Sequence, residues 1–69
     1  MKRKAWVIKL FDKNSRYNGC YVEENEEGYV KDINKALILD TRQEARNIGF
    51  EWGERPIKVI VETKITEVK

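Results

Sequence analysis

Apolar residues near the two ends of the chain alternate with polar ones or run together in short stretches, which predicts two strands. Residues 5–11, AWVIKLF, carry β-branched and aromatic side chains, and both alternating sets of positions are largely apolar. This pattern predicts a central strand, or one whose second face is partly covered. Residues 57–68, IKVIVETKITEV, predict the longest strand, with one wet and one dry face as in an antiparallel sheet covered on one side. The apolar face comprises Ile57, Val59, Val61 and Ile65.

The segment that follows the first strand predicts a hairpin. Residues 12–15, DKNS, form a turn by composition, and residues 16–23, RYNGCYVE, predict the return strand. Asn18-Gly19 within that strand fits either a tight turn or a bulge. We favour the bulge, because residues 12–15 already supply a loop.

The middle of the chain predicts shorter elements. Residues 24–28, ENEEG, predict a second turn, and residues 29–31, YVK, a short strand. Residues 32–35, DINK, predict a polar bend. Residues 36–39, ALIL, then predict a short buried strand or an extended segment.

A helix is predicted to begin at Thr41. The Thr41 hydroxyl can accept a hydrogen bond from the amide of Glu44, and the Glu44 side chain can reach back to the Thr41 amide, as in a capping box. Ala45, Ile48 and Trp52 then recur at steps of three and four residues, which predicts one apolar helix face.

The end of this helix has two interpretations, and both stay open. The helix could end at Gly49, with Phe50 packing back on Ala45 as a hydrophobic cap contact, or it could continue through Trp52 and end at Gly53. We favour the end at Gly49. If the helix continues instead, Phe50 faces away from the apolar face and is exposed beside Trp52.

These elements predict a single α+β domain over residues 1–69. Their expected order is β-β-(β)-β-α-β, which gives a small antiparallel or mixed sheet with one helix packed on one face. The pattern does not establish the strand order within the sheet.

Composition excludes several kinds of function. The 69 residues include no His and one Cys, so the chain cannot build the usual zinc site or a His-based catalytic triad by itself. Cys20 has no His to activate it and is expected to be a buried strand residue. We therefore expect no enzymatic activity from the monomer, no cofactor and no metal.

Compartment and assembly follow from the same composition. No apolar run of about 18 residues exists that could cross a membrane. Behind the basic residues 1–4, the apolar run 5–8 is too short for a signal peptide, so we expect a cytoplasmic protein. With no disulfide or metal to stabilise so short a chain, a homodimer is a further expectation.

Charged residues suggest two kinds of partner. The net charge is +2, from 14 Lys and Arg against 12 Asp and Glu. The acidic run Glu23–Glu27 is expected to be a solvated hairpin tip, with docking on a basic protein surface as the alternative. Its spacing does not fit an EF-hand loop, and the positive net charge argues against mimicry of DNA.

Four residues around the helix are candidates for partner binding. Arg42 and Arg46 lie one helical turn apart, where they could contact phosphates or pair with nearby glutamates. If the helix continues through Phe50, that exposed aromatic side chain beside Trp52 would mark a partner surface. Trp52, like Trp6, is nevertheless expected to belong to the core.

A nucleic-acid surface is the alternative. Basic residues together with Tyr17, Tyr21 and Tyr29 could line a groove that follows phosphates and stacks on bases. The basic set comprises Lys2, Arg3, Lys4, Arg16, Lys31, Lys35, Arg42, Arg46 and Arg55.

Three motifs also resemble those of small uncharacterised proteins of bacteriophages and prophages. They are the strand Trp6-Val7-Ile8-Lys9, the hairpin Gly19-Cys20-Tyr21 and the segment 32–45, DINKALILDTRQEA. The resemblance covers about two thirds of the chain and rests mostly on fold signals. It implies a phage or mobile-element origin, no defined activity and no catalytic residues.

The sequence therefore predicts a non-enzymatic protein-interaction module. Contact through a sheet edge or through the helix region is expected, and a phage accessory protein that modulates a host factor would fit the size of the chain. The alternative is a small nucleic-acid-binding protein that uses the basic and aromatic residues.

Overall fold

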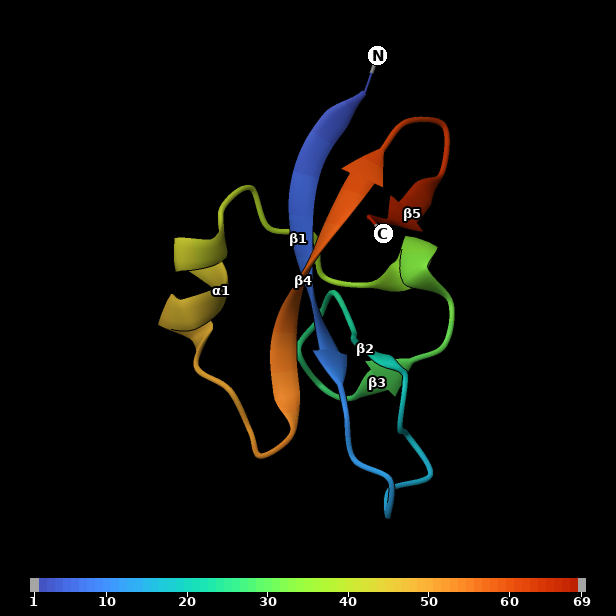
Figure 1. Cartoon of the computed structure of the whole chain (residues 1–69), viewed down its shortest axis with the longest axis vertical. Helices are drawn as coiled ribbons and strands as arrows, with labels where there is room; N and C mark the ends of the chain where they lie inside the picture. Colours follow the sequence, from blue (N-terminus) through green and yellow to red (C-terminus); the bar gives the residue numbers. More distant parts are fainter. Residues whose placement is uncertain (1, 69) are drawn as a thin grey trace.

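The first predicted strand lies at the centre of the fold. The computed structural model describes residues 2–68, which form one five-stranded antiparallel sheet, one α-helix and one 3-10 helix (Figure 1). The elements are β1 (Arg3–Leu10), β2 (Tyr21–Val22), β3 (Tyr29–Val30), η1 (Ile33–Lys35), α1 (Arg42–Ile48), β4 (Glu54–Val61) and β5 (Ile65–Glu67). The strand order is β3-β2-β1-β4-β5, so the prediction of a central first strand is confirmed. None of these helices is both long and apolar enough to cross a membrane.

Strand β1 pairs along its whole length on one side and in parts on the other. It is antiparallel to β4 from Arg3 opposite Val61 to Leu10 opposite Glu54. On its other side it pairs with β2 at Lys9, and Trp6 exchanges backbone hydrogen bonds of 2.8 and 2.9 Å with Leu39. Residues 36–39 therefore extend the sheet beside β1 without forming a regular strand.

Both faces of β1 are covered, which explains why both of its alternating sets are apolar. Ala5 and Val7 are fully buried on the face that packs against β2, β5 and η1, and Ile8 is 1% exposed on the opposite face, toward α1. Figure 1 shows α1 on one side of β1 and β4, and η1 with β5 on the other. The first cluster contains Ala5, Val7, Tyr21, Ala36 and Val59, and the second contains Ile8, Leu39 and Ala45.

The C-terminal prediction of one long strand is wrong. The chain reverses at residues 62–64, and β5 pairs back on β4 with Val61 opposite Ile65. Residues directly opposite in an antiparallel pair point to the same face, so the predicted apolar face is confirmed although the strand is broken. The observed element order is β-β-β-α-β-β, which keeps the α+β class and corrects the predicted order.

Strand β4 also begins earlier than predicted and contains Pro56. Just beyond the ends of the two strands, Phe11 N donates a hydrogen bond to Gly53 O. Along an antiparallel pair, hydrogen-bonded residue pairs such as this one alternate with pairs that are not hydrogen-bonded. Pro56 lies opposite Ile8, at a position where the backbone nitrogen of β4 points away from β1. Strand β5 does not extend as far as Pro56, so no neighbouring strand needs a hydrogen bond from this position. A residue without an N–H is tolerated at such an open edge.

The predicted return strand 16–23 is reduced to the two residues of β2, and the bulge at Asn18-Gly19 is wrong. Residues 13–19 form turns instead. The Asn18 side chain accepts a hydrogen bond of 2.9 Å from the amide of Asp12, so it closes this loop on itself. Gly19, with φ of +85°, then donates to Leu10 O at 2.8 Å and returns the chain to the sheet.

Helix α1 begins as predicted and takes the shorter of its two expected lengths. The Thr41 hydroxyl accepts from the Glu44 amide at 3.1 Å, and the helix ends at Gly49, where φ is +87°. Ala45 is fully buried, as expected for the apolar face, but Ile48 is 41% exposed. Trp52 lies outside the helix and is 78% exposed, so the expectation that it belongs to the core is wrong.

Candidate interaction site

The loop between α1 and β4 begins and ends with a glycine. Gly49 and Gly53 both have positive φ values, which L-residues with a side chain rarely adopt. At the second glycine the loop is fastened to the end of β1, because Phe11 N donates to Gly53 O at 2.7 Å. Glu54 N donates to Glu51 O at 3.1 Å, which closes a turn over residues 51–54. At the helix end, Gly49 N donates to Arg46 O at 3.1 Å, so the loop is anchored both where it leaves the helix and where it enters β4.

This loop displays large apolar side chains on the surface. Phe50 is 41% exposed and Trp52 is 78% exposed, beside the exposed Ile48 at the end of α1. We call Ile48, Phe50 and Trp52 the apolar patch. For a helix that ends at Gly49, we expected Phe50 to pack back on Ala45 as a hydrophobic cap contact. The helix does end at Gly49, yet the Phe50 side chain is exposed.

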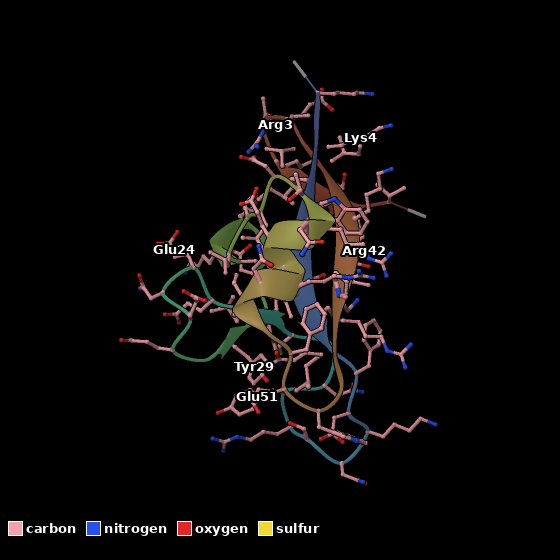
Figure 2. The ribbon with its side chains drawn as sticks, turned by 90° about the vertical axis from the view of Figure 1, so that its left-hand side faces the viewer. Arg3, Lys4, Glu24, Tyr29, Arg42 and Glu51 are labelled. Atoms are coloured by element: carbon pink, nitrogen blue, oxygen red, sulfur yellow. The ribbon has the colours of Figure 1, made fainter. Side chains whose placement is uncertain are left out.

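The two candidate arginines lie on the neighbouring helix surface. Arg42 and Arg46 are both exposed on α1, and Figure 2 shows Arg42 on the side of α1 toward β4. Among residues 2–68 neither arginine forms an ion pair, so the expected alternative of pairing with nearby glutamates is not observed.

A groove opens beside the patch, between the α1–β4 loop and the β2–β3 turn. Its volume is about 310 Å³. Its floor and one end are apolar, formed by Ile8, Val22 and Ile48. Its rim is acidic, formed by Glu26 and Glu27 from the turn and by Glu51 and Glu54 from the loop and the start of β4. We call this cavity the acidic groove.

Tyr29 connects the two walls of the acidic groove. Its hydroxyl donates a hydrogen bond to Glu54 Oε2, and Glu54 Oε1 accepts from the Glu51 amide at 3.0 Å. Burial, the hydrogen bond to Glu54 and the negative charges of Glu54, Glu51 and Asp12 raise the pKa of Tyr29 to about 12. Tyr29 and Glu51 lie close together near one end of the molecule in Figure 2, as expected for two residues that line one groove.

A second polar cluster lies on the other face of the sheet and is structural. The Glu67 carboxylate of β5 accepts from Lys9 Nζ of β1 at 2.7 Å and from the Tyr21 hydroxyl of β2. The bonds from Lys9 and Tyr21 lower the pKa of Glu67, whereas burial and Glu67 raise the pKa of Tyr21 to about 12. We call this cluster the Glu67 bridge, because it joins strands that are not neighbours in the sheet.

Sequence reasoning identified only part of this site. It singled out the acidic run Glu23–Glu27, but Glu24 does not line the groove and points outward in Figure 2. It missed Glu51 and Glu54, which the fold brings opposite the turn from more than twenty residues away. No local pattern signals that approach, because it depends on how β2, β1 and β4 pair.

Over residues 2–68, no group of three or more Cys, Asp or Glu side chains is arranged to hold a metal ion. Cys20 is 4% exposed, so its expected burial is confirmed, but it lies one residue before β2 and not within a strand. In comparisons with protein families, with curated proteins and with solved structures, nothing matches this chain.

Proposed function

We propose that this domain is a non-enzymatic protein-interaction module that binds through the apolar patch. The observation that carries the proposal is the 78% exposure of Trp52 on an anchored loop. Full burial of a Phe or Trp side chain removes roughly 150–250 Å² from water, and Trp is enriched among residues that dominate binding energy. A partner that covers Phe50 and Trp52 would therefore gain most of its affinity here.

The anchoring of the loop supports this proposal. A flexible loop loses conformational entropy when it binds, whereas one already fixed at both ends loses less. The hydrogen bond from Phe11 to Gly53 and the turn over residues 51–54 hold the patch in place in the free protein. The sheet edges offer less, because β3 has two residues, β5 has three, and the part of β4 that β5 leaves open contains Pro56, which has no N–H to donate.

Nucleic-acid binding is the second candidate, favoured by Arg42 and Arg46, which are exposed and form no ion pair within the described part of the chain. Of the three tyrosines expected to stack on bases, Tyr17 is 38% exposed with Arg16 over its ring, but the other two are occupied differently. Tyr21 is 9% exposed and donates to Glu67, and Tyr29 donates to Glu54 within the acidic groove. Negatively charged groups beside a stacking surface repel phosphates, so protein binding is the better-supported function.

The identity of the partner is a separate proposal. A host protein modulated by a small phage accessory protein would fit the resemblance of residues 32–45 to such proteins. In the structure those residues include Asp32, which caps η1, and Thr41, which caps α1. The shared motif is thus accounted for by the fold, and it supports an origin more than an activity.

Sedimentation equilibrium distinguishes these functions. We expect the mass to be unchanged by a short duplex DNA at about 50 mM and about 200 mM salt, both for the wild type and for Arg42→Ala/Arg46→Ala. A salt-sensitive increase in mass that the double variant loses would overturn the proposal. A concentration-dependent dimer that Trp52→Ser abolishes would identify the partner as a second copy of the chain.

A further inference from the structure

We propose that the acidic groove receives a lysine or arginine side chain from a basic segment of the partner protein. The charged head would lie between Glu27 and Glu51 on the rim, and the aliphatic stem would lie on the apolar floor. This inference rests on the proposed function, because it names the chemistry of the partner that the neighbouring apolar patch binds.

Charge complementarity identifies the occupant as cationic. Four glutamates line the acidic groove, and no Lys or Arg among residues 2–68 lines it to neutralise them. Arg3 and Lys4, which begin β1, lie at the opposite end of the long axis from Glu51 and Tyr29 in Figure 2. The basic start of β1 is therefore too distant to fill the groove of its own chain.

The apolar floor narrows the choice among cations. Val22, which is half-buried, and Ile48, which is 41% exposed, would face the body of any occupant, whereas Ile8 is 1% exposed and closes the groove from the second core cluster. Long basic side chains combine an apolar stem with a charged head, which matches a floor and rim of this kind. A bare metal ion would leave the floor empty, and a wholly apolar group would desolvate the carboxylates without pairing them.

The position of the acidic groove joins it to the apolar patch. Ile48 belongs to both surfaces, and the loop that carries Glu51 on the rim also carries Phe50 and Trp52. A protein segment whose basic side chain enters the groove would continue over the patch. Aromatic anchors beside polar and charged contacts are the usual composition of protein interfaces.

The test is a titration of the ¹⁵N-labelled full chain, followed by NMR, with a short peptide of alternating lysine and leucine. We expect shifts at the groove residues Val22, Gly28 and Gly49. A peptide of alternating glutamate and leucine should cause none. Glu27→Gln/Glu51→Gln removes one charge from each wall of the groove and should weaken the lysine peptide by about tenfold.

A matched variant controls for the change in net charge. Glu24→Gln/Glu62→Gln also removes two exposed carboxylates, neither of which lines the groove, and should leave the affinity within about twofold of the wild type. Equal weakening by both double variants would show a non-specific charge effect and would overturn the inference.

Three further results would also overturn it without deciding the proposed function. One is the absence of lysine-peptide shifts at millimolar concentration. Another is a set of shifts confined to Phe50 and Trp52. The third is equal affinity for spermidine, which would assign the groove to a small polyamine. The proposed function is tested separately, in a binding assay with the protein partner. It fails if a substitution at Trp52 leaves the affinity for that partner unchanged.

Discussion

The Glu67 bridge should contribute measurably to the stability of the curled sheet. We consider Tyr21→Phe, which removes one hydroxyl from the bridge and leaves the aromatic ring in the first core cluster. A hydrogen bond to a charged group contributes about 1.5–3 kcal/mol when well shielded. The Glu67 side chain is 32% exposed, so water replaces part of the lost bond. We therefore expect a cost of about 1 kcal/mol, below the range for shielded bonds to charged groups.

A double-mutant cycle separates the bond from other effects. Glu67→Gln should cost about 1–2 kcal/mol, because Lys9, whose side chain is 19% exposed, loses its carboxylate partner. The double variant should cost less than the sum of the single changes, by up to about 1 kcal/mol, because Glu67→Gln weakens the bond from Tyr21 by removing the negative charge of its acceptor, and Tyr21→Phe removes the same bond. Thermal unfolding followed by circular dichroism suits a domain of this size, in which 1 kcal/mol corresponds to roughly 4–8 °C.

The pH dependence gives a second readout of the same bridge. The pKa of Glu67 is lowered in the folded state from its ordinary value of 4.5. Its contribution is therefore present above pH 4.5 and is lost as the pH falls through the lowered folded value. Glu67→Gln should flatten the loss of stability on acidification below pH 4.5. If Tyr21→Phe costs nothing and the cycle shows no coupling, the bridge does not hold the strands together.

Three further predictions concern the glycines, the helix cap and the tyrosines. Gly19 and Gly53 share a φ of +85°, but only at Gly53 would a Cβ lie 2.9 Å from a backbone oxygen. Gly19→Ala should lower the free energy of unfolding by about 1–2 kcal/mol, and Gly53→Ala should lower it distinctly more. Equal losses of unfolding free energy in urea would contradict this difference in geometry. Thr41→Ala should lower the free energy of unfolding by about 1 kcal/mol, and Thr41→Ser much less because serine keeps the capping hydroxyl. If Thr41→Ala costs nothing, the cap is not formed. Tyr21 and Tyr29 should ionise near pH 12 in the folded protein. The stability that their raised pKa values contribute is present below pH 10 and is lost toward pH 12, and ultraviolet absorbance would refute this if every tyrosine ionised near pH 10.

Local signals in the sequence predicted the elements that local interactions define. The cap at Thr41 depends on a residue three positions away, and the central strand depends on alternation within residues 5–11. The turn between β4 and β5 was missed for a physical reason. Val61 and Ile65 lie on one face whether the strand continues or folds back with those residues opposite each other, so the apolar pattern is the same in both cases.

The candidate site was predictable only where its residues were neighbours in the chain. Phe50 was identified because a helix continuing through it would expose it beside Trp52, but Trp52 itself was expected on the buried face, and its exposure depends on the helix ending at Gly49. The acidic groove needs Glu27 and Glu51 on opposite walls. Their approach follows from the pairing of β2 and β4 with β1, which no sequence period encodes.

Photochemical crosslinking from position 52 tests the central claim most directly. A benzophenone amino acid in place of Trp52 would be compared with the same group in place of Val68, which is also exposed at 44% but lies just beyond β5. In extracts of the source cells, we predict that the group at position 52 forms a protein adduct and that the group at position 68 forms none. Excess unmodified domain should prevent the adduct from position 52. Adducts to nucleic acid alone, or equal protein adducts from both positions, would contradict it.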